Sequence, residues 1–154
     1  MKNEVKIRNA KPSDMAQLTQ LCAAHAAYEK ATYDYTGKEE SLAKDLFSPM
    51  PKLFCLVATV GDTLIGYTTF MVQYATWTAS EYIYMDCLFI KEHARGNGIG
   101  EQLVEQIKQA GSTMGCSLIQ WQTPDFNTGA VKFYKRIGAD SLSKERFFLN
   151  VEKP

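Results

Sequence analysis

The chain has 154 residues, 45% of them hydrophobic and 22% charged, which is typical of one globular domain, here residues 1–154, with a core of its own. Its 17 basic and 17 acidic residues balance, so the composition favours no polyanionic partner such as nucleic acid. No apolar run reaches membrane-spanning length and the first residues do not resemble a signal peptide, so we expect no membrane association and a cytoplasmic location.

Sequence patterns in the first half predict a strand, two helices and a hairpin. Alternating apolar residues predict a strand over residues 4–9, and Pro12 opens a helix that should run to about Lys30. Thr36 and Glu39 have the spacing of a capping box and should begin a second, shorter helix. Two β-branched runs joined by a Gly-Asp turn predict the hairpin, with strands over residues 53–60 and 63–74.

The second half alternates strands and helices. A long central strand is expected over residues 81–90, followed by a helix from Gly98 to about Gly115. A strand over residues 117–122, a helix over 128–136 and a final strand over 147–151 complete the chain. This order predicts an α/β (α+β) fold, with a mixed sheet flanked by helices.

The cysteines and histidines give no sign of a metal site or of a nucleophilic triad. The cysteines are scattered without the spacing of metal ligands, and each lies in an apolar stretch: Cys22, Cys55, Cys87 and Cys116. We therefore expect buried, reduced thiols. His25 and His93 have no partner at a useful spacing, so we expect neither a metal nor Cys/His catalysis.

The most informative segment is Arg95-Gly-Asn-Gly-Ile-Gly100, which joins the strand that ends at Ile90 to a helix. Its glycines let the backbone approach a ligand closely. The first N–H groups of the helix are unpaired and lie at the positive end of its dipole, which suits a pyrophosphate. A glycine-rich turn that only joins a strand to a helix is the structural alternative. A P-loop is excluded because Glu101-Gln102 follow Gly100, and a dinucleotide motif is excluded because the third glycine comes one residue early.

Two segments carry a family resemblance. Arg95, Gly98 and Gly100 form the pattern Arg-x-x-Gly-x-Gly, and residues 127–139 combine an Asn, an aromatic pair and a closing Gly-Ala. Through them the chain resembles the GNAT superfamily of acyl-CoA-dependent N-acetyltransferases. Shorter segments, such as Tyr28-Glu29-Lys30, resemble the diamine branch, which acetylates spermidine, spermine, thialysine and related amines. The resemblance implies the GNAT fold, a mostly antiparallel mixed sheet splayed at the cofactor site and flanked by about four helices.

The resemblance also implies where acetyl-CoA binds. The pyrophosphate would lie on the backbone amides of the glycine turn, with the guanidinium of Arg95 reaching the phosphates and a surface salt bridge as its alternative role. The pantetheine would follow the end of the central strand, where a backbone N–H near Leu88 would polarise the thioester carbonyl. The implied cofactor-binding residues are Leu88, Phe89, Ile90, Arg95, Gly96, Asn97, Gly98, Ile99, Gly100, Asn127, Lys132 and Tyr134.

Tyr134 and Asp86 are the candidate catalytic residues. Tyr134 lies where the family places its general acid, and a phenol with a pKa of about 10 suits reprotonation of a thiolate; a core aromatic beside Phe133 is the alternative. Asp86 interrupts an apolar strand, where a carboxylate is costly unless it is paired or functional. It would bind the ammonium group or deprotonate it through a water, or else accept a structural hydrogen bond. The diamine branch usually has Glu-Asp here, whereas this chain has Asp86-Cys87.

Three further residues are candidates for binding the amine substrate. Glu29 matches a family acid near the substrate end of the first helix, although a solvated helix-end charge is equally compatible with its position. Tyr74 and Trp77 would line the amine site and contact the substrate through apolar packing and cation–π interactions. Together with Asp86, these residues form the expected substrate-binding set.

The sequence therefore predicts an acetyl-CoA-dependent N-acetyltransferase that acts on a small cationic amine. Direct attack in a ternary complex is favoured over an acetyl-cysteine intermediate, because Cys87 has no basic partner in the sequence. The resemblance to the diamine branch implies a homodimer. Two alternatives stay open. One is another acceptor, such as a peptide N-terminus, a protein lysine, an aminoglycoside or an amino acid; the other is a non-catalytic acyl-CoA-binding module.

Overall fold

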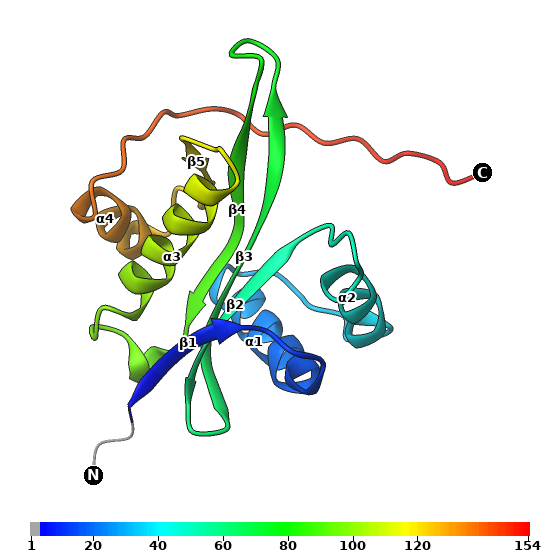
Figure 1. Ribbon diagram of the computed structural model, residues 1–154, viewed down its shortest axis with the longest axis vertical. Helices are drawn as coiled ribbons and strands as arrows, with labels where there is room; N and C mark the ends of the chain where they lie inside the picture. The colour runs from blue at the N-terminus through cyan, green and yellow to red at the C-terminus, as the bar shows by residue number, and fades with distance from the viewer. Residues whose placement is uncertain (1–3) are drawn as a thin grey trace. The chain divides into compact units, whose positions relative to one another are not determined.

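The computed structural model describes residues 4–154 (Figure 1). The chain forms two compact units, of which the first ends at Gln122 and the second comprises Thr123–Pro154. No helix in the described part of the chain is long and apolar enough to cross a bilayer.

The first unit is built on a five-stranded sheet in the order β1-β2-β3-β4-β5. β1 to β4 are antiparallel neighbours, and β5 pairs parallel to β4, so the expected mixed, mostly antiparallel sheet is confirmed. β3 and β4 form the long hairpin of Figure 1. The strands are β1 (Val5–Asn9), β2 (Phe54–Val60), β3 (Thr63–Ala75), β4 (Ser80–Ile90) and β5 (Ile119–Gln120).

Helices cover both faces of this sheet. On one face, α1 (Met15–Tyr28) packs Leu18 and Leu21 against Tyr67 of β3 and Phe89 of β4. On the other face, α3 (Ile99–Thr113) approaches so closely that a Cβ on Gly111 would stand 3.1 Å from Ile83 of β4. The remaining helices of this unit are α2 (Lys38–Leu46) and two short 3-10 helices, Pro12–Asp14 and Glu92–Ala94.

A partly buried ion pair joins the first strand to the start of α1. Both guanidinium nitrogens of Arg8 reach the Asp14 carboxylate, at 2.7 and 3.0 Å, and the backbone N–H of Lys11 donates to the same group at 2.9 Å. These charged hydrogen bonds hold the pKa of Asp14 below its usual range. The carboxylate therefore fixes the angle at which the chain leaves β1 and enters the helix.

The expected capping box of the second helix is wrong. α2 begins after Gly37, which has a φ of +71° and receives no side-chain capping bond. The backbone N–H of Thr36 instead donates to Asp34 at 2.9 Å, which makes a local turn before the helix. A glycine in the left-handed conformation starts this helix where a threonine side chain was expected.

In the second unit, α4 (Thr128–Arg136) matches the expected helix, and the side chain of Asn127 caps it by accepting from the N–H of Ala130 at 3.3 Å. The expected final strand over residues 147–151 is wrong, because residues 139–154 form neither helix nor strand. A strand needs a hydrogen-bonded neighbour, and the sequence pattern alone does not supply one. In the first unit, the strand expected over residues 117–122 is confirmed only at Ile119–Gln120.

Candidate active site

Asp86 lies at a β-bulge in the central strand. Cys87 pairs with Thr69 and Met85 with Phe70, so Asp86 is an extra residue on β4 without a partner on β3. A bulge shifts the alternation of the strand, and here Phe89 packs on the α1 face whereas Ile83 packs against α3. The bulge therefore turns a charged residue out to solvent in the otherwise apolar second half of β4.

Beyond the bulge, one edge of β4 has no strand beside it among the described residues of the first unit. The ladder with β5 is limited to Ile83 and Tyr84. The N–H of Lys91 donates to the carbonyl of Ile65 on β3 at 2.8 Å, and strand alternation then directs the backbone groups of Leu88 and Ile90 away from β3. Accordingly, the carbonyl of Ile90 accepts from Nε of Arg95 at 2.8 Å. The backbone of Leu88 thus faces the open edge.

Internal hydrogen bonds and a buried side chain stabilise the glycine turn, whereas the space beside its glycines is open. Gly96 and Gly98 have φ values of +81° and +76°, and a Cβ built on either would meet no atom within 4 Å. The side chain of Asn97 donates to the carbonyls of Ala94 and Arg95 at 3.0 and 3.3 Å, while Ile99 is buried. Because this turn opens α3, it presents the first N–H groups of the helix, and Gly96 and Gly98 add no side chain beside them, which fits a pyrophosphate.

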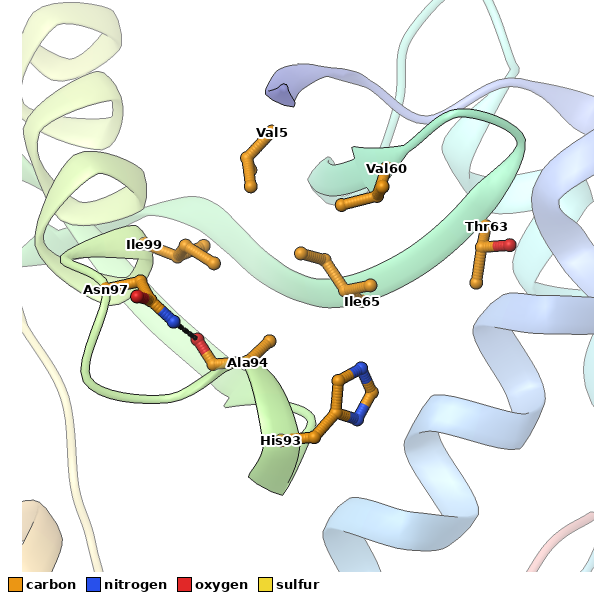
Figure 2. Close-up of a pocket in the computed structure, with 8 residues that line it drawn as sticks. All are labelled: Val5, Val60, Thr63, Ile65, His93, Ala94, Asn97 and Ile99. Carbon is orange, nitrogen blue, oxygen red and sulfur yellow. Dashed lines mark hydrogen bonds between the residues drawn. The ribbon is translucent and has the colours of Figure 1, made fainter. Parts of the chain in front are cut away.

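An open pocket of about 480 Å³ lies behind the turn (Figure 2). Asn97 and Ile99 contribute to it, and Figure 2 shows the bond from the Asn97 amide to the carbonyl of Ala94. No carboxylate lines it, so it is a poor site for a cationic amine. Its other lining residues are Val5, Val60, Thr63, Ile65 and His93.

His25 and Glu29, at the end of α1, form a hydrogen-bonded network beside β4. Nε2 of His25 lies 2.6 Å from the Glu29 carboxylate, and Nδ1 lies 2.9 Å from the hydroxyl of Tyr67. The imidazole also stacks on Phe89, with the ring centroids 5.2 Å apart. The carboxylate expected to bind the amine is therefore held in place by a half-buried histidine.

Several charges act on the His25 ring. Burial is the largest influence and lowers its pKa, whereas the charges of Glu29 and Asp86 raise it and that of Arg95 lowers it. Arg95 lies close because its guanidinium packs over the rings of Tyr28 and Phe89, at 4.6 and 5.4 Å. Glu29 thus contacts the imidazole directly, and the charges of Asp86 and Arg95 also act on it.

Cys87 is poorly suited to act as a nucleophile. Burial and then the charge of Asp86 raise the pKa of its thiol to about 12, so it stays protonated near neutral pH. Its S–H donates to the Asp86 carboxylate at 3.7 Å. All four cysteines are free.

The other expected site residues occupy different parts of the chain. Asn127, Lys132 and Tyr134 lie on or beside α4 in the second unit, where the ring of Tyr134 is half-buried and 5.3 Å from that of Phe133. Tyr74 and Trp77 are exposed on the β3–β4 hairpin.

The hairpin places Tyr74 and Trp77 away from the bulge. Tyr74 pairs with Glu81, five residues before Asp86, which corresponds to about 17 Å along the strand at about 3.4 Å per residue. Trp77 lies farther still, in the turn of the hairpin. Within one copy of the chain, the structure therefore does not bring these two residues beside Asp86.

His25 and Tyr67 are residues that sequence analysis missed. The available signal was the four-residue spacing of His25 and Glu29, which places both on one face of a helix. The contact with Tyr67 joins positions 42 residues apart and has no local signature. Among the described residues, no group of three or more His, Cys, Asp or Glu side chains is arranged to hold a metal ion.

Comparison with known proteins places these features in a family context. A family model described as "Acetyltransferase (GNAT) family" matches residues 19–139. The chain is 32% identical over 148 residues to a thialysine N-epsilon-acetyltransferase of Sus scrofa, an alignment that covers 91% of this chain and 86% of the relative.

Solved structures agree on the fold. An integron cassette protein from the mobile metagenome of V. cholerae has a TM-score of 0.71 and 28% identity, over 97% of this chain and 93% of that one. An aminoglycoside N-acetyltransferase solved with CoA has a TM-score of 0.77 and 16% identity, over 97% of each chain. At that identity the second likeness concerns the fold alone.

Proposed function

Because the chain belongs to the GNAT family of acetyltransferases and is an acetyl-CoA-dependent N-acetyltransferase, we propose that it acetylates a primary amine of a small cationic substrate. The substrate class is a polyamine, a diamine or a thialysine-like amine. The amine attacks directly in a ternary complex, without an acetyl-enzyme intermediate. The high pKa of Cys87 supports this choice, because it keeps the thiol nearest to Asp86 protonated.

The observation that carries the proposal is the pair of carboxylates around His25. Glu29 accepts from the imidazole, and the charge of Asp86 acts on the same ring. Glu29 and Asp86 supply two negative charges against the one positive charge of Arg95, which favours binding of a cation. In this proposal Glu29 holds a remote ammonium group, while Asp86 binds the reacting amine or takes its proton through a water.

The chain also offers a site suited to acetyl-CoA, which supplies an acetyl group activated as a thioester. The glycine turn would hold the pyrophosphate on its N–H groups, and the open edge of β4 would hold the pantetheine. The N–H of Leu88, directed to that edge, would stabilise the negative charge that develops on the carbonyl oxygen.

Tyr134 completes the proposed chemistry by protonating the departing thiolate. The family match continues from the first unit through α4, which supports one acetyltransferase domain over residues 1–154. The resemblance to the diamine branch further supports a homodimer. We place the enzyme in the cytoplasm, in keeping with its free cysteines.

A different acceptor is the second candidate. Aminoglycosides also carry several ammonium groups. The same pair of carboxylates would suit such a substrate, so the choice depends on the shape of the pocket rather than on its charge.

The test is release of the coenzyme A thiol from acetyl-CoA at mildly alkaline pH. The panel contains spermidine, spermine, thialysine, lysine, aminoglycosides and short peptides. Turnover of a polyamine or thialysine supports the proposal, and it should fall in Asp86→Asn but not in Asp62→Asn, a change in an exposed turn. Turnover of aminoglycosides alone selects the second candidate. Binding of acetyl-CoA without turnover of any amine would indicate a non-catalytic module.

A further inference from the structure

The hydroxyl of Tyr67 is a polar group buried in the core beneath the candidate active site. The side chain of Tyr67, on β3, is only 1% exposed and packs beside Phe89 of β4. Its hydroxyl lies 2.9 Å from Nδ1 of His25. A buried hydroxyl is costly unless it has partners, and a buried polar network that is fully hydrogen-bonded makes the groups in it rigid. The contacts of this hydroxyl therefore indicate a role beyond packing.

On the side of α1, the Tyr67 hydroxyl is linked to Glu29 through His25. Tyr67 donates to Nδ1 of the imidazole, and Nε2 of the same ring donates to the Glu29 carboxylate, which lies 2.6 Å away. The ring also stacks on Phe89 with the centroids 5.2 Å apart, which restrains its plane. Because the imidazole is rigid, the position of the hydroxyl determines where the carboxylate of Glu29 is held.

On the side of β4, the same hydroxyl is linked to Asp86 through Cys87. Tyr67 lies opposite Phe89 in the ladder, so Cys87 is its diagonal neighbour on the same face of the sheet. Diagonal neighbours are about 7–8 Å apart, within reach of an aromatic side chain. The thiol of Cys87 donates to the Asp86 carboxylate at 3.7 Å.

The thiol of Cys87 is a permanent donor near neutral pH. Burial and the charge of Asp86 raise its pKa to about 12, against the lowering effect of a hydrogen bond with Tyr67. The thiol therefore keeps its proton and can restrain Asp86 throughout the reaction. One buried phenol is thus connected to both carboxylates of the proposed amine site, although its own hydroxyl is shielded from the substrate.

We propose that Tyr67 is a positioning residue that fixes the spacing of Glu29 and Asp86, and that this spacing selects diamines by the distance between their two ammonium groups. The inference rests on the proposed function, in which Glu29 holds a remote ammonium group and Asp86 the reacting amine, and it names the residue that determines substrate length. Each ammonium group needs its own carboxylate. A diamine that is one methylene too short or too long therefore loses one of the two contacts.

The first experiment measures the binding of α,ω-diamines to the full chain by calorimetry, in the presence of coenzyme A. The series runs from ethylenediamine to hexamethylenediamine. We expect the wild type to prefer one length over its neighbours by about tenfold, the effect of one methylene in a shaped site. In Tyr67→Phe this preference should fall about fivefold, which is typical of the loss of one hydrogen bond. Butylamine has a single ammonium group, so its affinity should be the same in both proteins.

Tyr82→Phe is the matched control, because it removes a phenol hydroxyl that donates to Gln73 in the β3–β4 hairpin. It should keep the length preference of the wild type. A purely structural role of Tyr67 predicts an equal loss of affinity for butylamine and for every diamine. That result, an unchanged preference in Tyr67→Phe, or a wild type that binds all lengths equally would overturn the inference.

A second pair of variants tests the link to Asp86 without altering the phenol. Cys87→Ala removes the thiol that donates to Asp86, and we expect it to weaken the length preference as Tyr67→Phe does. Cys116→Ala is its control, because Cys116 is a buried free cysteine that lies beside Gly111 of α3. It should keep the preference. A Cys87→Ala variant with the length preference of the wild type would contradict the role of the thiol and overturn the inference.

Release of the coenzyme A thiol from acetyl-CoA, measured with the same diamines, separates this inference from the proposed function. Diamines that bind with a sharp length preference but are not acetylated contradict only the function. Diamines that are acetylated and bound equally well at every length contradict only the role of Tyr67. A wild type that binds no diamine would overturn both.

Discussion

Nε2 of His25 lies 2.6 Å from the carboxylate of Glu29, the residue that follows the last turn of α1. The carboxylate is only an acceptor, so Nε2 carries the proton, and in the neutral ring Nδ1 must then accept from the hydroxyl of Tyr67 at 2.9 Å. The carboxylate thus selects the tautomer of the histidine that orients it at the proposed amine site, and the buried phenol of Tyr67 donates to the nitrogen that remains.

Replacement of His25 with Gln should weaken amine binding more than it slows the chemistry. Glu29 would lose its fixed orientation, and we expect the KM for the amine to rise about tenfold, which corresponds to about 1.4 kcal/mol. The kcat at saturating amine should change less. The control is His93→Gln, at an exposed position of the 3-10 helix Glu92–Ala94, which should leave both constants unchanged. An unaltered KM in His25→Gln would remove His25 from the positioning role.

The lowered pKa of His25 also predicts how stability depends on pH. The folded protein holds this ring neutral below the usual value of about 6.5, so the unfolded chain binds the proton more readily. The contribution to stability is present above pH 6.5 and is lost as the pH falls below it. Urea unfolding between pH 7.5 and 5.5 should show a smaller loss of stability in His25→Gln than in the wild type. Equal losses in the two proteins would contradict the assignment.

Two glycines provide a matched pair for testing the turn. Gly98 and Gly37 each precede a helix with φ near +70°, and neither would place a Cβ against another atom. Alanine at either position should cost about 1 kcal/mol of stability through backbone strain alone. Only Gly98→Ala should also weaken acetyl-CoA binding, which calorimetry would measure. The reason is that its added methyl group would obstruct the proposed phosphate site. Equal affinity in the two variants would place the pyrophosphate elsewhere.

Local sequence patterns were enough to predict most of the fold. Ile99, Leu103 and Ile107 recur at helical spacing, and all three are buried in α3 as that spacing requires. Patterns of this kind succeed because each element buries one face, whichever partner it meets. The strand expected over residues 147–151 is the exception, because its pattern favours a strand but does not determine which strand would pair with it.

The geometry of the candidate site was harder to predict from local sequence patterns. The glycine turn is contiguous and could be recognised, but the bulge at Asp86 depends on how β4 pairs with β3. The role of His25 likewise depends on Tyr67, which the fold brings to it from another element. Sequence analysis therefore found the charged residues, but not the contacts that set their geometry and their pKa values.

The ion pair between Arg8 and Asp14 should be important for stability. Asp14→Asn would remove two charged hydrogen bonds from a buried carboxylate, and we expect a loss of about 2 kcal/mol in urea unfolding at pH 7. Asp45→Asn is the control, because the Asp45–Lys52 pair is longer, at 3.6 Å, and more exposed. Since the pKa of Asp14 is lowered, its stabilisation is present above about pH 3.8 and is lost below that value. Equal effects of the two substitutions would show that the Arg8 pair contributes little.

Tyr134→Phe tests the proposed general acid. Loss of the hydroxyl should lower kcat about 100-fold, within the range typical of general acid catalysis, while the affinity for acetyl-CoA stays nearly unchanged. Tyr82→Phe removes a phenol of the β3–β4 hairpin that donates to Gln73 at 2.7 Å, and it should have no effect on kcat. The pH profile gives an independent check, because a phenol that acts as an acid should produce an alkaline limb that disappears in Tyr134→Phe. If Tyr134→Phe kept full turnover and the same profile, another group would have to protonate the thiolate.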